Sequence, residues 1–552
     1  MIRDLLQFRP DPHVVPDVCI VGAGAAGIML AVELAGLGRT VTLLEGGGAA
    51  IEESAQTPYE SECAALPHRG LHGGRFRALG GTTTMWGGQI LKLQESDFER
   101  RAWIPESGWP ISTHDLEPHY ERALELEGLR NVIRSDRDVW KALGKAGPPD
   151  SGDFTSYLSR WCPEPNFARL HRRSLEHDAR IDTWLHAHAV ELLLEDGTAR
   201  GVRCRTSEGK ETIFRAKTYV FALGAIESSR FFLQPRDNGG LPWNDSGLLG
   251  RHFQDHIDSD AAEVTPLDAR AFRDAFDTIF LSGHRYTPKL TLSAARQRAD
   301  RLLNVGATVY SAADENDALT PLKSNAKKLL KGELREVKVK EVWPMMRHAP
   351  TLLAGAYRYA VEHRAFHPAS AKFRLRVHCE QEPTSASTIT LSPLRDAFGL
   401  RKTALAWKIS PLEIQTIRRL VELAQSSLEG VGRVIPHPAL FDQDDAFIGY
   451  CQDSFHHMGG MRMHRLPTLG VVDTDLRLHG VRNCFVCSSA VFPTSGFSNP
   501  THTLLALSVR LAHHLLNETT SYLQESEERR SEAVDDALPN PERPAACFVA
   551  PP

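Results

Sequence analysis

The chain has 552 residues, of which 42% are hydrophobic and 24% are charged, and its formal net charge at pH 7 is −5. This composition is ordinary for a globular enzyme, and the charge gives no reason to expect a nucleic-acid partner. Length alone suggests about three to four domains. We expect fewer, because large doubly wound folds run long.

The N-terminal region has no secretion signal that we can identify. Asp4 and Asp11 stand where the apolar core of such a signal would lie in residues 1–16. The longest apolar stretch, residues 18–34, is interrupted by glycines and belongs to the motif described below. We therefore expect no membrane span.

The cysteines are scattered and nine in number. Cys484 and Cys487 form a C-x-x-C pair inside a strand-like run, but no second cysteine pair follows at zinc-site spacing. This usage predicts reduced thiols in a cytoplasmic protein and no metal site.

Residues 14–45 carry the motif around which the chain is organised. They read as a strand, a tight turn, a helix and a second strand that ends on Glu45. Gly22 permits the turn, Gly24 lets a pyrophosphate approach the backbone, and Gly27 lets the helix pack closely. The helix N-terminus favours phosphate, and an acid at the end of the second strand suits a ribose diol. The motif predicts a dinucleotide site and fits FAD and NAD equally.

A second glycine-rich stretch covers Gly73–Gly88 and reads GGRFRALGGTTTMWGG. A flexible linker is one interpretation. Met85 and Trp86 are poor choices for a solvated linker, however, and so many glycines favour backbone lying against a flat ligand.

These two stretches together resemble the glucose–methanol–choline (GMC) oxidoreductase family, FAD enzymes that oxidise alcohols. The resemblance is closest to its pyranose-oxidase-like and sugar-dehydrogenase branch. In pyranose oxidases, the residue before the tryptophan of this loop is a histidine bonded covalently to FAD, whereas here it is Met85. The resemblance therefore implies FAD that is held without a covalent bond.

The motif and the resemblance together give a set of expected cofactor contacts, drawn from the glycine-rich segments, the central strands and the C-terminal block. They are Gly22, Gly24, Ala25, Ala26, Gly27, Glu45, Gly46, Arg75, Gly81, Thr82, Met85, Trp86, Gly87, Gly88, Val190, Ala222, Gly224, Ser488, Pro500 and Thr501.

The middle of the chain alternates between strand and helix patterns. Residues 181–215 predict a small antiparallel meander, and residues 219–228 predict a buried strand that enters a helix through a glycine. Further expected strands cover 286–293, 305–310, 373–380, 387–391 and 403–409, and an expected helix covers 411–429. Ser410 and Glu413 form the capping box of that helix.

Residues 318–366 have a helical pattern and a run of basic side chains between 323 and 340. A membrane-surface helix is one interpretation. We favour a solvated helix face, because glutamates interrupt the positive charge.

The expected fold class is α/β. A Rossmann-type FAD-binding domain comprises residues 1–130, 171–256 and 449–516. A discontinuous α+β substrate-binding domain, a sheet covered by helices, comprises residues 131–170 and 257–448. The polar, proline-rich residues 517–552 predict a disordered tail.

Residues 454–463 fit the H-x-x-G motif of the family with His456 first, and Gly496–Thr501 contains Asn499. By this resemblance His456 is the catalytic base and Asn499 its partner. An alcohol proton needs a base at neutral pH, and neutral imidazole is the usual group. We expect structural roles for four other histidines: His256, His457, His464 and His502.

The favoured hypothesis is an FAD-dependent oxidation of a secondary alcohol, such as a sugar or glycoside ring hydroxyl, to a ketone. The partners would be a small alcohol or carbohydrate and an electron acceptor, either O2 or a quinone or dye. A non-redox lyase or isomerase on the same scaffold is the alternative. A nucleotide sensor without catalysis is less consistent with the motif, because His456 and Asn499 would have no purpose.

Overall fold

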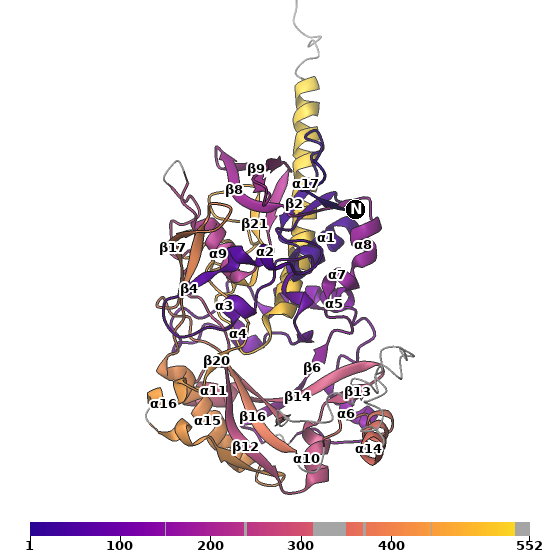
Figure 1. Ribbon diagram of the computed structural model, residues 1–552, viewed down its shortest axis with the longest axis vertical. Coiled ribbons are helices and arrows are strands. Elements are labelled where there is room, and N and C mark those ends of the chain that lie inside the picture. The colour runs from indigo at the N-terminus through magenta and orange to yellow at the C-terminus, as the bar shows by residue number, and fades with distance from the viewer. Residues whose placement is uncertain (149–150, 237–239, 313–348, 368–370, 443, 536–552) are drawn as a thin grey trace, which may run out of the picture.

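The computed structural model describes residues 1–148, 151–236, 240–312, 349–367, 371–442 and 444–535. A six-stranded sheet forms the centre of the upper half of the molecule in Figure 1, and all its neighbouring strands are parallel. In order across the sheet they are β1 (Ile2–Asp4), β7 (Ile181–Leu185), β3 (Val41–Leu44), β2 (Val18–Val21), β11 (Thr218–Phe221) and β21 (Cys484–Val486). The chain passes from β2 to β3 on one side, while β11 and β21 add on the other. Such a reversal opens a crevice at the carboxyl ends of the central strands.

Helices cover this parallel sheet. After β2, α1 (Ala25–Gly36) begins at the glycine motif, and its buried face is almost entirely apolar. It packs against α17 (Pro500–Asp535), which in turn contacts α5 (Glu117–Leu126). After β11, α9 (Ala225–Leu233) begins directly after Gly224, as the glycine between strand and helix predicts.

The expected meander is present but starts later than predicted. Three antiparallel strands form it: β8 (His188–Glu195), β9 (Thr198–Arg205) and β10 (Glu211–Phe214). The prediction is wrong for Ile181–Leu185, which join the parallel sheet as β7. The reason is burial on both faces, since four of these five residues are buried, as a central parallel strand requires.

A nine-stranded sheet dominates the lower half of Figure 1. Its main path runs β19 (Gly432–Pro436), β12 (Ile257–Pro266), β16 (Lys372–Cys379), β15 (Val305–Ala312), β14 (His284–Leu292), β6 (Phe154–Trp161) and β5 (Gln89–Ile90), with β13 (Ile279–Leu281) on β14 and β20 (Gln452–Asp453) on β12. The helices α15 (Pro411–Ser427) and α10 (Ala269–Phe276) pack against it. Ser410 and Glu413 form the capping box expected for α15.

Two expected strands of this sheet belong elsewhere. β17 (Thr388–Arg395) and β18 (Arg401–Ala406) pair with β4 (Ser61–Cys63) in a separate sheet, and β17 packs against α9 on the nucleotide side. Their sequences alternate as half-buried strands do, but alternation does not specify which sheet a strand joins.

The remaining helices are short. They are α2 (Glu53–Gln56), α3 (Gly70–Gly73), α4 (Glu95–Phe98), α6 (Asp136–Leu143), α7 (Phe167–Leu170), α8 (Arg172–His177), α11 (Ala294–Asp300), α14 (Ala349–Ala360) and α16 (Asp444–Ile448), with 3₁₀ turns at Thr57–Tyr59, Gly81–Thr84, Thr113–Asp115, Pro438–Phe441 and Ser489–Val491. Across the described parts of the chain, none of the helices combines the length and apolarity needed to traverse a bilayer.

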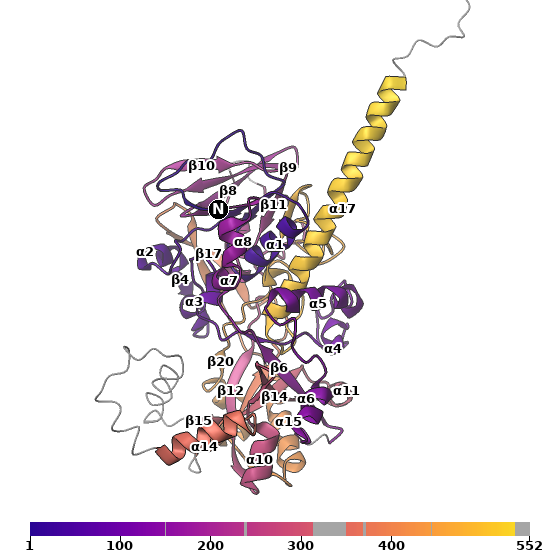
Figure 2. The same cartoon turned by 90° about the vertical axis from the view of Figure 1, so that its right-hand side faces the viewer.

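The predicted disordered tail is wrong for residues 517–535, which continue α17 away from the body of the molecule in Figure 2. This stretch contains glutamate, arginine and alanine and no proline or glycine, so nothing in it stops a helix. Residues 536–552 lie outside the described residues. The same holds for the basic run between 323 and 340, so its predicted solvated face stays a prediction; α14 lies in the later part of that segment.

Candidate active site

A cavity of about 630 Å³ lies at the carboxyl ends of β2, β3 and β11, where Val21, Leu44 and Ala222 line it. Most residues expected to contact a cofactor line this cavity, as do both proposed catalytic residues: Gly22, Gly24, Ala25, Ala26, Glu45, Gly46, Arg75, Gly81, Thr82, Met85, Trp86, Gly87, Ala222, Gly224, Ser488, Pro500, Thr501, His456 and Asn499. Gly27, Gly88 and Val190 do not line it. Val190 lines a neighbouring cavity. The residues just before it that line the large cavity are Ala187, His188 and Ala189.

The glycine turn has the geometry that a pyrophosphate requires. Gly22 has φ +105°, and a Cβ atom there would lie 2.5 Å from the carbonyl oxygen of Ala222. A Cβ atom at Gly27 would lie 1.9 Å from the Gly22 carbonyl oxygen, so Gly27 packs the helix rather than facing the cavity. At Gly24 the corresponding space is open, and no side chain caps the N-terminus of α1. The backbone N–H groups at this end are therefore available to an anion.

The second glycine-rich stretch lies directly on this turn. The Gly80 N–H donates to the carbonyl oxygen of Ala23 over 2.9 Å, and a Cβ atom at Gly81 would lie 2.8 Å from the Cα of Gly24. The indole of Trp86 donates to the carbonyl oxygen of Pro165 over 2.6 Å. The stretch is thus an ordered wall of the cavity and not a flexible linker. Met85 lines the cavity with 63% of its surface exposed.

Glu45 is buried at the end of β3, and its two carboxylate oxygens accept hydrogen bonds from the N–H groups of Ala23 and Gly47. Burial raises the pKa of Glu45. Each oxygen keeps a further lone pair, which is the chemistry that a diol needs.

Sequence reasoning missed Arg77 and His188, which line the same end of the cavity as Glu45. A guanidinium nitrogen of Arg77 lies 2.6 Å from His188 Nδ1. Burial holds the pKa of His188 well below its ordinary value, so the imidazole is neutral and its Nδ1 accepts from Arg77. Arg77 lies inside the glycine-rich stretch, two residues after Arg75, and its charge within that stretch was the available signal.

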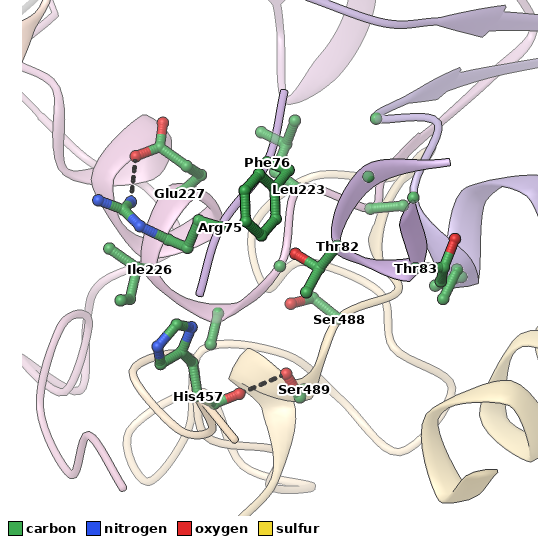
Figure 3. Close-up of a pocket in the computed structure, with 18 of the residues that line it drawn as sticks. Arg75, Phe76, Thr82, Thr83, Leu223, Ile226, Glu227, His457, Ser488 and Ser489 are labelled. Carbon is green, nitrogen blue, oxygen red and sulfur yellow. Dashed lines mark hydrogen bonds and ion pairs between the residues drawn. The ribbon is translucent and has the colours of Figure 1, made fainter. Parts of the chain in front are cut away.

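Arg75 is also a wall residue, but its guanidinium is occupied by the protein (Figure 3). It pairs with Glu227 over 2.9 Å and donates to the carbonyl oxygens of Leu71 and Tyr59. Glu227 also pairs with Arg230 over 3.0 Å. Burial alone would raise the pKa of Glu227, but the two arginines outweigh it and hold that pKa below its ordinary value. Because Glu227 is far from Arg75 in sequence, no local pattern indicates this pair.

His456 and Asn499 meet at the cavity. The amide nitrogen of Asn499 lies 3.0 Å from His456 Nε2, and α17 begins at the next residue, Pro500. His456 comes from the loop after β20, so the two side chains, 43 residues apart, are brought together by the fold. On its other side, His456 Nδ1 lies 2.9 Å from His256 Nδ1.

The electrostatics of this pair favour a neutral base. Burial, together with His256, His378 and Lys289, holds the pKa of His456 well below 6.5. The imidazole is therefore uncharged at neutral pH and can accept a proton.

The backbone that carries His456 is held by Asp255, which is fully buried. Its Oδ1 accepts hydrogen bonds from the N–H groups of Ser454 and His456 over 3.1 and 3.0 Å. Its Oδ2 lies 3.3 Å from His68 Nε2. Sequence reasoning assigned no role to Asp255 or His68.

The other histidines for which we predict structural roles also have protein partners. His457 Nε2 lies 3.9 Å from Asp255 Oδ2, and Ser489 donates to the His457 carbonyl oxygen (Figure 3). His502 pairs with Glu127 over 2.8 Å, and His464 accepts a hydrogen bond from the N–H of Leu466. His457 also lines the cavity.

Residues 383–508 match the family model described as GMC oxidoreductase. Paromamine 6'-oxidase of Streptomyces fradiae is 23% identical over 94% of both chains. C-glycoside 3-oxidase of Microbacterium trichothecenolyticum is 30% identical over 23% of this chain and 24% of that protein.

Two solved structures have the same mixed α/β fold over nearly the whole chain. Pyridoxine 4-oxidase of Mesorbium loti superposes with a TM-score of 0.55 at 16% identity, covering 90% of this chain and 98% of that one. A formate oxidase variant from Aspergillus oryzae, studied for FAD modification, superposes with a TM-score of 0.53 at 15% identity, covering 93% and 100%.

Proposed function

We propose that the chain is a GMC oxidoreductase that oxidises a secondary alcohol, a ring hydroxyl of a sugar or glycoside, to a ketone with FAD as cofactor. The single observation that carries the proposal is the contact between His456 and Asn499 at the wall of the large cavity. Two relatives are named paromamine 6'-oxidase and C-glycoside 3-oxidase, and the second name supports the glycoside class.

FAD fits the residues present. The open N-terminus of α1 and the close approach of Gly81 to Gly24 suit a pyrophosphate, and Glu45 suits a ribose. Met85 in place of a histidine supports non-covalent binding. When bound, FAD supplies the hydride acceptor. The N-terminus of α17 at Pro500 and Thr501 favours negative charge beside it.

His456 and Asn499 act on the substrate hydroxyl. The oxygen accepts a hydrogen bond from the Asn499 amide N–H and donates its own proton to His456 Nε2. Loss of that proton leaves the electron pair of the O–H bond on the oxygen. This pair forms the C=O bond as the carbon releases a hydride. The two contacts also fix the direction of the C–H bond.

The test is anaerobic flavin reduction, screened over monosaccharides, O- and C-glycosides and simple alcohols. We expect a glycoside or sugar to bleach the flavin, and His456→Ala to slow this by about 10²–10⁴-fold with unchanged flavin content. His464→Ala is the matched control and is expected to behave like the wild type.

If no compound bleaches the flavin but one is converted to product, the enzyme is a non-redox lyase or isomerase, and the hypothesis of alcohol oxidation is wrong. A preparation that binds no FAD at all would contradict both. Admitting air after reduction decides the electron acceptor: rapid reoxidation indicates O2, and slow reoxidation that a quinone accelerates indicates a dehydrogenase.

A further inference from the structure

His256 is the second side chain that touches the proposed base. It precedes β12 and has no accessible surface. Its Nδ1 lies 2.9 Å from His456 Nδ1, with the ring centroids 4.9 Å apart and the ring planes at 77°. Within the described residues, His256 and Asn499 are the two side chains hydrogen-bonded to the His456 ring. The base is therefore held at both of its nitrogen atoms.

These two contacts define where the protons are. The Asn499 amide nitrogen can only donate, so His456 Nε2 must accept and carries no proton. A neutral imidazole carries one proton, which therefore sits on His456 Nδ1. That N–H donates to His256 Nδ1, which in turn must be unprotonated. The proton of His256 then lies on its Nε2.

The surroundings keep both rings neutral before reaction. Burial lowers the pKa of His256 to about 4, and Lys289 adds to this, while the backbone of Ser495 and Gly496 and the carboxylate of Asp258 act in the opposite direction. Lys289 on β14 and His378 on β16 also face His456. Two neutral imidazoles can share one hydrogen bond, whereas two imidazolium ions could not.

We propose that His256 is a positioning residue, which fixes His456 in the tautomer with its proton on Nδ1 and shares the proton that His456 takes from the alcohol. The proposal rests on the proposed function, because it assigns a partner to the base of that reaction. Without His256, nothing among the described side chains would accept the Nδ1 proton of His456, and a neutral ring could place its proton on Nε2 instead. That tautomer has no lone pair facing the substrate.

The same contact stabilises the product of proton transfer. The alcohol O–H bond breaks and a His456 Nε2–H bond forms, which leaves His456 as an imidazolium ion. Its Nδ1–H bond to the neutral His256 then becomes a charge-assisted hydrogen bond, about twice as strong as a neutral one. If the proton moves from His456 Nδ1 to His256 Nδ1, His456 becomes neutral and His256 becomes the imidazolium ion. The positive charge then lies one ring further from the reacting carbon.

The decisive measurement is ¹⁵N NMR of the histidine side chains in the flavin-loaded protein, with the His456 signals assigned by their loss in His456→Ala. We expect His456 to be the Nδ1–H tautomer at pH 7. We expect His256→Leu to shift this population towards the Nε2–H tautomer, and His256→Gln, whose amide oxygen can accept the Nδ1 proton, to restore it. An Nε2–H tautomer in the wild type would overturn the proposal.

Kinetics give a second readout. In His256→Leu the limiting rate of flavin reduction should fall by about 10–10³-fold, as expected for a base in the wrong tautomer, while the apparent substrate Kd stays within about twofold. His256→Gln should recover much of the rate. Flavin content and melting temperature identify a variant that fails to fold. A His256→Leu enzyme that folds and keeps the wild-type rate would overturn the proposal.

The two proposals fail separately. If no alcohol reduces the wild-type flavin, the proposed function is wrong, while NMR still decides the tautomer of His456. If the wild type reacts and the His256 variants behave like it, the proposed function stands and the role of His256 is wrong. His464→Leu serves as the control histidine in both measurements.

Discussion

His456 and His457 are neighbours in the chain with opposite surroundings. His456 faces Asn499 and His256, whereas His457 turns towards the buried Asp255. In extended chain, consecutive side chains point to opposite sides, so a single backbone loop presents one imidazole to each environment. The family motif predicts the first of the two as the base, and the geometry agrees with this hypothesis, because its Nε2 is the nitrogen that lies beside a donor at the cavity.

The pH dependence of the reaction follows from the surroundings of one residue, His456. Burial, with His256, His378 and Lys289 as neighbours, holds the pKa of His456 well below 6.5. A protonated base cannot accept the alcohol proton, so activity is lost only as pH falls through this lowered pKa. We expect the limiting rate of flavin reduction to be independent of pH from about pH 6.5 upwards. This range ends where Lys289, whose pKa is about 8, loses the positive charge that helps to hold the pKa of His456 down.

Stopped-flow reduction from pH 5 to 9 checks this expectation. A half-maximal rate between pH 6 and 7 would show an ordinary imidazole and contradict the buried, neutral base. Thermal stability recorded at each pH separates loss of the base from loss of the fold.

At the scale of elements, the strand–turn–helix unit of β2 and α1 depends on two glycines for different reasons. Gly22 adopts a left-handed conformation, which favours glycine. Gly27 has an ordinary backbone conformation but no room for a side chain, because the Gly22 carbonyl lies where its Cβ would be. Gly36 at the other end of α1 is exposed, with no atom near its Cβ position.

Gly27→Ala is therefore expected to push α1 away from the turn, with reduced flavin content and a lower melting temperature. A clash this short cannot be relieved without backbone movement, and overpacking of this kind costs about 1–3 kcal/mol. Gly36→Ala is the matched control. It replaces a helical glycine by alanine in open space, so stability should rise by up to about 1 kcal/mol. Equal effects of the two changes would show that the helix does not pack on the turn as described.

At the scale of the whole molecule, a buried ion pair joins two segments that are 279 residues apart in the chain. Arg101, from the segment that follows β5, makes two hydrogen bonds to Glu380, which follows β16 of the large sheet. Both side chains are almost inaccessible, and Glu380 also accepts from the N–H of Asn304 over 2.7 Å. These two distant segments are thus fixed to each other by charge in the interior of the molecule.

Glu380→Ala should destabilise the protein by about 3–5 kcal/mol, because it removes the carboxylate that is hydrogen-bonded to the buried Arg101 guanidinium. Denaturant unfolding followed by tryptophan fluorescence measures this cost. The control is Glu117→Ala, which removes an exposed pair with Lys92 and should cost less than about 1 kcal/mol. If both changes cost the same, the Arg101–Glu380 pair is not the buried connection that the geometry indicates.

Local patterns predicted much of this fold. The hydrophobic periodicity and the positions of glycine and proline located β2, α1, β3, β11 and α15. The Ser410–Glu413 capping box marked the start of α15. They failed where the same pattern fits two structures: Ile181–Leu185 joined the parallel sheet, and β17 and β18 formed a separate sheet with β4. A strand pattern records which faces are buried, and carries no information on the neighbouring strand.

What the sequence by itself determined is the chemistry of short segments. The spacing of Gly22, Gly24 and Gly27 specifies a turn for an anion, and the family motif singles out His456 and Asn499. Only the tertiary structure decided which groups meet across long separations: His256 on His456, Glu227 on Arg75, and Glu380 on Arg101. The physical reason is range. Backbone conformation and capping act over a few residues, whereas hydrogen bonds between distant side chains exist only after sheets and helices have packed.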